Sequence, residues 1–285
     1  MCKAFSCIVT KKGDVFWKAG MDSHDEILAD AKIKDDTTDG DLIKFAKIEI
    51  TPDKGYLYPE DKWTLKVDEN TIPRWLTKAK KYLCWIAFGK WKEQIYSGIN
   101  LAEAINPINP LKLTPREVTE SDKELLKKWV SVKASVWDSV WVSVRASVWD
   151  SVWDSVRASV WDSVGDSVWV SVWASVGVSV WDSVGASAWA SVGASVRDSV
   201  WDSVGDSVWD SVGASVGASV WAYIGSLFPN ITGWKCAPKT DGYPYQPCVD
   251  LWKRGFVASF DGKVWRLHSG PKATIVYEWT QEKKS

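Results

Sequence analysis

The sequence has 285 residues, a formal net charge of −1 and 46% hydrophobic residues, which is enough apolar material for the cores of one to three domains. The balanced charge argues against general attraction to nucleic acid or to anionic membranes, and no stretch approaches the 18 consecutive apolar residues of a membrane span. We expect no secretory signal peptide after Met1. The five cysteines are odd in number and form no C-x-x-C motif, which predicts reduced thiols in a cytoplasmic protein.

Residues 1–128 are predicted to form a mixed α/β domain. Alternating apolar residues at 2–10 and 14–20 flank a Lys-Lys-Gly turn and predict a hairpin. A helix is expected at 22–31 with Ser23 as its N-cap, because acidic residues follow in its first turn. The remaining expected elements are strands at 42–50 and 62–67, an amphipathic helix at 72–96 and a short helix at 119–129 with Ser121 and Glu124 at capping-box spacing.

Residues 129–222 are a tetrapeptide repeat, visible in "KASVWDSVWVSVRASVWDSVWDSVRASVWDSV" at 133–164. From Ser131 onward there are 23 successive units in which Ser is invariant and Val is replaced once, by Ala188. The third position holds twelve Trp, seven Gly, three Arg and one Lys, and the fourth holds ten Asp, ten Ala and three Val. Because the third-position residues share no packing property, we expect that position to face solvent and the valines to be buried.

This pattern predicts a β-solenoid with the valines in its core. A single α-helix is the main alternative, and other packings remain open. On a helix of 3.6 residues per turn, a four-residue step slips by about 40° per unit, so the valine stripe would circle the helix more than twice over 23 units. Val, Ser and Gly also have low helix propensity.

A coil of twelve residues is favoured over one of sixteen. Third-position residues match in 11 of 20 comparisons three units apart but in only 4 of 19 comparisons four units apart. Matches two units apart number 9 of 21, so three sides are preferred by a small margin. On this register three columns form along the rod: Lys133 with Arg145 and Arg157; Trp137, Trp149, Trp161 and Trp173; and Asp138, Asp150 and Asp162.

The segment "DSVWDSVRASVWDSV", followed by "WAYIGSLF", resembles tetrapeptide-repeat arrays in uncharacterised phage-type and environmental proteins. It is more distantly similar to the pentapeptide-repeat and hexapeptide-repeat β-helices. The resemblance implies a β-helical rod and supplies no catalytic residues. This chain departs from the pentapeptide pattern by one residue per side.

Residues 223–285 are predicted to form a small α/β cap, with a helix at 247–255 and strands at 256–270 and 273–279, the first of these ranges turning at Asp261-Gly262. The whole chain is therefore expected to be α+β, with a central β-solenoid at 129–222 between capping domains at 1–128 and 223–285. The end coils of a solenoid need such covers because they expose unpaired backbone.

Candidate catalytic residues are few. Cys2 would become the N-terminal residue after removal of Met1 and could act as an N-terminal nucleophile, although Gly does not follow it. His24 is expected to have a surface role near a helix start, and His268 is expected to be a packed or hydrogen-bonded strand residue. Residues 35–41 are acidic but lack the Glu of an EF-hand loop, and the sequence contains no nucleotide-binding or hydrolase motif.

The Trp-bearing faces of the repeat are the preferred functional feature. The proposed binding residues are Trp137, Trp149, Trp161, Trp173, Asp138, Asp150, Asp162, Arg145 and Arg157. The repeat carries ten Asp against four basic residues, so it disfavours nucleic acid and favours protein partners or self-association. We therefore expect a non-enzymatic interaction or structural protein without cofactor or metal. The alternatives are a hydrolase using Cys2 and an aromatic-ladder binder of single-stranded nucleic acid or glycan.

Overall fold

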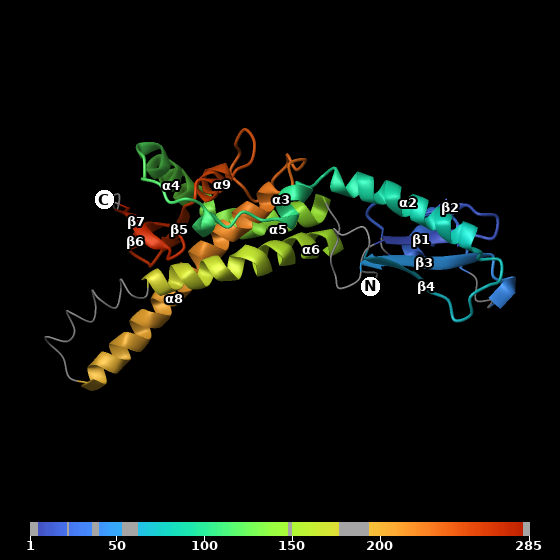
Figure 1. Cartoon of the computed structure of the whole chain (residues 1–285), viewed down its shortest axis with the longest axis horizontal. Coiled ribbons are helices and arrows are strands. Elements are labelled where there is room, and N and C mark those ends of the chain that lie inside the picture. The colour runs from blue at the N-terminus through green and yellow to red at the C-terminus, as the bar shows by residue number, and fades with distance from the viewer. Residues whose placement is uncertain are drawn as a thin grey trace. The chain divides into compact units, whose positions relative to one another are not determined.

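A computed structural model of the chain describes residues 5–21, 23–35, 40–52, 62–147, 150–176 and 194–281. The chain divides into two compact units, of which the first comprises Met1–Leu101 with Arg145–Val156 and the second comprises Ala102–Val144 with Arg157–Ser285. Each unit has its own small antiparallel sheet (Figure 1). The protein is therefore α+β, as expected.

The sheet of the first unit has the strand order β2-β1-β3-β4, with every neighbouring pair antiparallel. Its elements begin and end as predicted to within a few residues, including the hairpin between the first two strands. The strands are β1 (Phe5–Thr10), β2 (Val15–Phe16), β3 (Phe45–Pro52) and β4 (Trp63–Val67), and a 3-10 turn, η1 (Gly40–Leu42), precedes β3.

Both faces of this sheet are covered by helices, because apolar residues occupy both sides of β1. Phe5 faces α2 (Lys78–Tyr96), where its ring lies 5.8 Å from Phe88 and 5.7 Å from Trp91. Ile8 points to the other face, where it packs with residues of α1 (His24–Asp30). Ser23 is the N-cap residue of α1, as predicted. The helix expected at 72–96 instead begins at Lys78, after a turn that contains Pro73.

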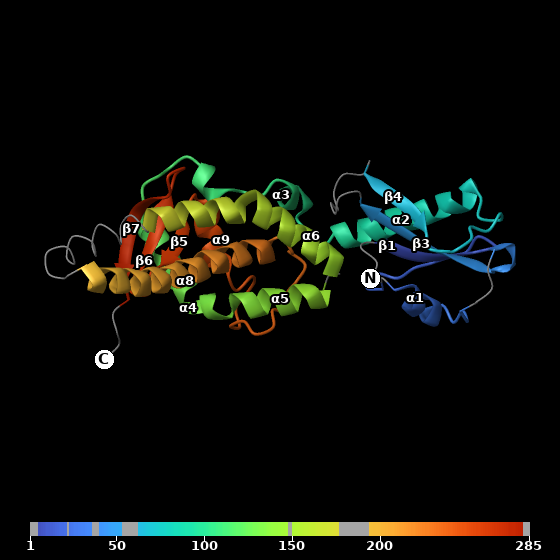
Figure 2. The same ribbon diagram turned by 90° about the horizontal axis from the view of Figure 1, so that it is seen from below.

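The described part of the repeat is helical, which corrects the expectation of a β-solenoid with twelve-residue coils. No strand occurs among its described residues. Its elements are η4 (Lys133–Ser135), α5 (Val136–Ser147), α6 (Asp150–Val160), the π-helical turn η5 (Trp161–Gly165), a helix at 166–176 and α8 (Ala194–Ser226). In Figure 2, α8 lies between α5 and the helix that runs through η5.

Burial of the valines is confirmed, although on helices rather than in a solenoid. Each valine of the repeat whose burial is described from Val136 on, in the second position of its unit, is at most 1% exposed; these are Val136, Val140, Val144, Val156, Val160, Val164, Val168, Val172, Val176, Val212, Val216 and Val220. The buried valines described on α5 and on α8 number three each, so the slip of about 40° per unit adds up to only about 80° there and still fits one face of a helix. The π turn at Trp161–Gly165 has more residues per turn than an α-helix, so it rotates the stripe back toward the core.

The second unit closes around α9 (Gln246–Lys253), which contacts both α4 (Glu120–Val132) and α8. Trp252 of α9 stacks on Tyr223 of α8 with ring centroids 5.3 Å apart, and its Nε1–H donates to the carbonyl of Ile108. Two short helical segments, α3 (Leu101–Ile105) and η3 (Pro110–Lys112), precede α4. The second sheet has the order β5-β6-β7, with β5 (Val257–Phe260), β6 (Val264–Ser269) and β7 (Thr274–Thr280), and it includes the predicted hairpin.

The capping box of α4 lies two residues earlier than predicted. Thr119 and Asp122 form it, in place of Ser121 and Glu124. Asp122 is fully buried and also accepts hydrogen bonds from Arg116 and Arg254. Burial would raise the pKa of Asp122, but the hydrogen bonds from Thr119 and Arg254 hold it below its usual value. Two arginines outside the helix, Arg116 and the sequence-distant Arg254, therefore favour Asp122 over Glu124 as the acid of the capping box.

Candidate functional site

The aromatic residues of the repeat gather where α5, η5 and α8 meet. Trp137 and Trp141 are one helical turn apart on α5, and their rings stack with centroids 5.8 Å apart and an interplanar angle of 9°. Trp221 of α8 meets Trp137 edge-on at 6.4 Å, and it also lies 6.3 Å from Trp161 of η5. We call Trp137, Trp141, Trp161 and Trp221 the indole cluster.

Large and small third-position residues face each other across the helices. A Cβ atom added to Gly217 of α8 would lie 4.0 Å from the indole of Trp161, and one added to Gly213 would lie 3.3 Å from Trp169. Tryptophans on one helix therefore pack over glycines of the next. This corrects the expectation that the third position faces solvent throughout, although Trp137 is indeed 51% exposed.

A pocket of about 500 Å³ opens beside the indole cluster. Its large walls are Trp137, Trp221 and Phe260, and its floor is the small-residue face of α8. That face belongs to units 211–214 and 215–218, which are the two successive units of the repeat that both have Gly in the third position. The lining residues are Lys133, Ala134, Val136, Trp137, Ser211, Ala214, Ser215, Gly217, Ala218, Trp221 and Phe260.

The pocket has one cationic group. Lys133 begins the 3-10 turn η4 between α4 and α5, and its Nζ lies 5.2 Å from the ring centroid of Trp265 in β6. Burial lowers the pKa of Lys133, and no described carboxylate contributes to that shift. A half-buried ammonium held over an indole is stabilised by the ring quadrupole but loses much of its hydration.

Serine side chains fix the wall between α8 and the second sheet. The backbone N–H of Phe260 donates to Ser215 Oγ at 2.9 Å, and that hydroxyl donates to the carbonyl of Val212 at 3.0 Å. Ser215 is 4% exposed, so this link is shielded from water. The position of Phe260 in the pocket wall is therefore set by the invariant serine of a repeat unit.

The structure brings together part of the predicted binding set. Trp137 and Trp161 both contact Trp221, whereas Trp173 does not line the pocket. Residues twelve apart on an α-helix differ by about 120° around the axis, so the predicted columns of Trp, Asp and basic residues do not form. Asp138, Asp162 and Arg145 are exposed and Arg157 is half-buried, outside the pocket lining. Trp149 and Cys2 lie outside the described residues, as does the side chain of Asp150.

The predictions for the two histidines had different outcomes. His268 is buried in β6 and hydrogen-bonded to Ser259 and Ala273, which confirms the expectation of a packed residue. His24 begins α1, as expected, but it is only 7% exposed, so the expected surface role is wrong. The acidic loop at 35–41 falls largely outside the described residues.

Sequence reasoning missed Lys133 as the pocket cation and Trp221 as the centre of the indole cluster. The available signal was local: Lys133 is the one lysine in the third position, and two Gly units precede the last Trp unit.

Comparisons with protein-family models, curated proteins and solved structures gave no match to this chain. Among the helices that the structure describes, none is both long and apolar enough to span a membrane.

Proposed function

We propose that the second unit is a non-enzymatic binding module whose pocket takes an aromatic group that carries a carboxylate. The observation that supports this function is Lys133, a desolvated cation without a carboxylate partner in the described structure, at the edge of an indole-lined pocket. An anionic ligand would offset the lost hydration of the ammonium. The rings of Trp137 and Trp221 would pack against an aromatic body.

The repeat itself has the matching chemistry. Seven of its units contain Trp directly followed by Asp, so an indole and a carboxylate occur on adjacent residues. A Trp-Asp unit of a second copy is therefore the occupant that we propose, and the protein would self-associate through its repeat. The net charge of the repeat does not oppose this association at the pocket, since the one charged lining residue is Lys133.

The test uses the full chain and a labelled decapeptide, SVWDSVWDSV, whose binding is followed by fluorescence anisotropy. We expect binding that falls by about tenfold in Lys133→Gln, which corresponds to about 1.4 kcal/mol. Lys128→Gln is the matched control, because Lys128 is an exposed lysine of α4 outside the pocket. The peptide SVWNSVWNSV, which lacks the carboxylates, should also bind about tenfold more weakly.

Equal affinity of the two peptides, or unchanged affinity in Lys133→Gln, would contradict the pocket assignment. Sedimentation velocity over a range of concentrations tests the second copy as occupant. We expect wild type to associate and Lys133→Gln to do so less. The wild-type protein could instead remain monomeric at every concentration and still bind the decapeptide. The proposed occupant of the pocket would then be another protein with an acidic aromatic segment, and not a second copy of this chain.

The alternative of an N-terminal-nucleophile hydrolase depends on Cys2, which lies outside the described residues. No contact described in the structure supports it. An aromatic binder of single-stranded nucleic acid shares the anionic chemistry of our proposal. An oligonucleotide that competes with the decapeptide at equal concentration would favour that alternative.

A further inference from the structure

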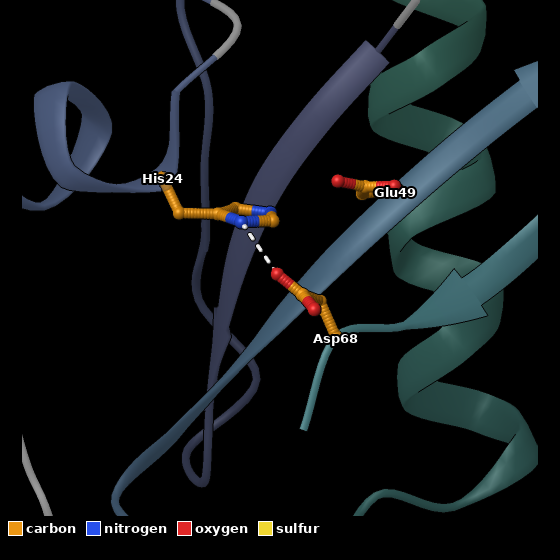
Figure 3. A group of neighbouring side chains, drawn as sticks. All are labelled: His24, Glu49 and Asp68. Atoms are coloured by element: carbon orange, nitrogen blue, oxygen red, sulfur yellow. Dashed lines mark ion pairs between the residues drawn. The ribbon is translucent and has the colours of Figure 1, made fainter. Parts of the chain in front are cut away.

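Three ligand-type side chains meet on the α1 face of the sheet in the first unit (Figure 3). His24 is the first residue of α1, Glu49 lies on β3, one of the two inner strands, and Asp68 follows the last residue of β4. One ligand atom from each of the three lies within 4.8 Å of the other two. They are brought together by the fold, since His24 and Glu49 are 25 positions apart in the sequence.

The ring of His24 is held in an orientation that suits metal binding. Its Nε2 lies 3.2 Å from the backbone carbonyl of Ile48, so Nε2–H is assigned as the donor. In the neutral ring the lone pair then lies on Nδ1, which faces the carboxylate of Asp68. A histidine that binds a metal through one nitrogen commonly donates its other N–H to a backbone carbonyl, which fixes both the tautomer and the ring.

The spacing between His24 and Asp68 fits two ligands of one ion better than it fits a hydrogen bond. Nδ1 and Oδ2 are 3.4 Å apart, whereas charge-assisted N–H···O bonds are about 2.7–2.9 Å long. A tetrahedral ion with bonds of about 2.0–2.1 Å places its ligand atoms about 3.3–3.4 Å apart along each edge. Nδ1 of His24 and Oδ2 of Asp68 are therefore already as far apart as two ligand atoms along one edge of such a tetrahedron.

The third ligand requires only side-chain movement. Asp68 is 62% exposed, so its carboxylate can rotate while the buried imidazole stays in place, and the half-buried Glu49 already has a ligand atom within 4.8 Å of both. Lys66 pairs with Glu49 across β3 and β4 and is exposed, so its side chain extends into solvent. Two carboxylates and a neutral imidazole then neutralise a divalent ion.

We propose that His24, Glu49 and Asp68 form a binding site for a divalent ion of the zinc class. An imidazole nitrogen with two carboxylate oxygens suits Zn²⁺ and Co²⁺, whereas Mg²⁺ and Ca²⁺ select oxygen ligands alone. Three protein ligands leave a tetrahedral ion one further position, which water fills. The site belongs to the first unit and is independent of the indole-lined pocket.

The test titrates the full chain with Zn²⁺ by calorimetry and with Co²⁺ by visible absorption. Cys236→Ser serves as the background because Cys236 is an exposed free thiol that could bind either ion. We expect one equivalent of each ion to bind, with weak Co²⁺ bands and without the intense near-ultraviolet absorption of cobalt–thiolate bonds. Mg²⁺ should bind at least about 100-fold more weakly than Zn²⁺.

Asp68→Asn and Glu49→Gln should each lower Zn²⁺ affinity by at least about tenfold. Glu26→Gln is the matched control, because Glu26 is an exposed acid of α1 outside the cluster, and its affinity should stay within about twofold of the background. Asp68 is an exposed side chain after β4, so Asp68→Asn keeps the fold even if a His24 variant does not. No Zn²⁺ binding in the background protein, or wild-type affinity in Asp68→Asn, overturns the proposal.

Discussion

At the scale of single residues, His268 shows how burial sets a protonation state. Its Nδ1–H donates to the carbonyl of Ala273 at 2.8 Å, and its Nε2 accepts the hydroxyl hydrogen of Ser259 at 2.7 Å. Burial lowers the pKa of His268 to about 4, with the nearby Arg266 acting in the same direction. The ring is therefore neutral at pH 7, where both of its nitrogens are satisfied.

The stability of the second unit should consequently depend on pH between about 6.5 and 4. An unfolded histidine binds its proton near pH 6.5, so the unfolded state holds more protons than the folded state in this range. The free energy of unfolding should fall by about 3 kcal/mol as the pH drops through the whole window. Urea unfolding at several pH values measures this slope. His268→Asn keeps a polar, non-titrating side chain and should lose this part of the slope, and equal slopes in both proteins would show that His268 is not responsible.

The two histidines also show what a sequence can predict about single residues. His268 lies within an alternating strand pattern, so its packing follows from local sequence. His24 became buried because Ile48 and Asp68, both distant in sequence, close over it. The sequence contains no spacing that joins His24, Glu49 and Asp68, and for that reason no metal site was predicted.

At the scale of elements, strands and short helices of the flanks were predictable because their alternation, turns and caps are local. The form of the repeat was not. The prediction treated the slip of the valine stripe as a bar to helix formation, but it assumed one uninterrupted α-helix. The π turn at Trp161–Gly165 lies within the longest described run of buried valines, and on α5 and α8 the burial of only three valines each is described, so the stripe stays on one face there.

The packing of α8 against α5 depends on a glycine. A Cβ atom at Gly225 would collide with the hydroxyl of Tyr243 and come within 2.9 Å of Val140 Cγ2. The Tyr243 hydroxyl cannot move freely, because it donates to the carbonyl of Ala222 at 2.7 Å. The close approach of these segments is therefore possible only without a side chain at position 225.

Gly225→Ala should lower the free energy of unfolding of the second unit by about 1–3 kcal/mol, since overpacking a tight contact forces neighbouring groups apart. Gly233→Ala is the control, because a Cβ atom there meets nothing within 4 Å. Thermal unfolding followed by near-ultraviolet circular dichroism reports the change. A Gly225→Ala protein as stable as the Gly233→Ala protein would contradict this packing.

At the scale of the whole molecule, the repeat is coupled to the elements that follow it. Inserting one extra Ser-Val-Gly-Ala unit after Ala218 would move Trp221 and Tyr223 by about 6 Å along the helix and rotate them by about 40°. Both the indole cluster and the stack on Trp252 would then be lost, and we expect a lower melting temperature and loss of decapeptide binding. The same four residues inserted after Gly233, in an exposed loop, should change little. Comparable melting temperatures for the two insertions would show that the register of α8 is not important.

The facing of tryptophans and glycines between helices has a consequence for the gene. Short tandem units readily gain or lose copies when a polymerase slips. In this protein, however, each added unit rotates the side chains after it around the helix axis, while the residues that they contact on other helices do not move. About nine added units, or ten full helical turns, return the side chains to the same face, but they also lengthen the helix by about 54 Å, so the original partners do not meet again. Copy number in this array should therefore vary far less within a population than repetitive DNA alone would allow, while base changes at solvent-facing positions accumulate.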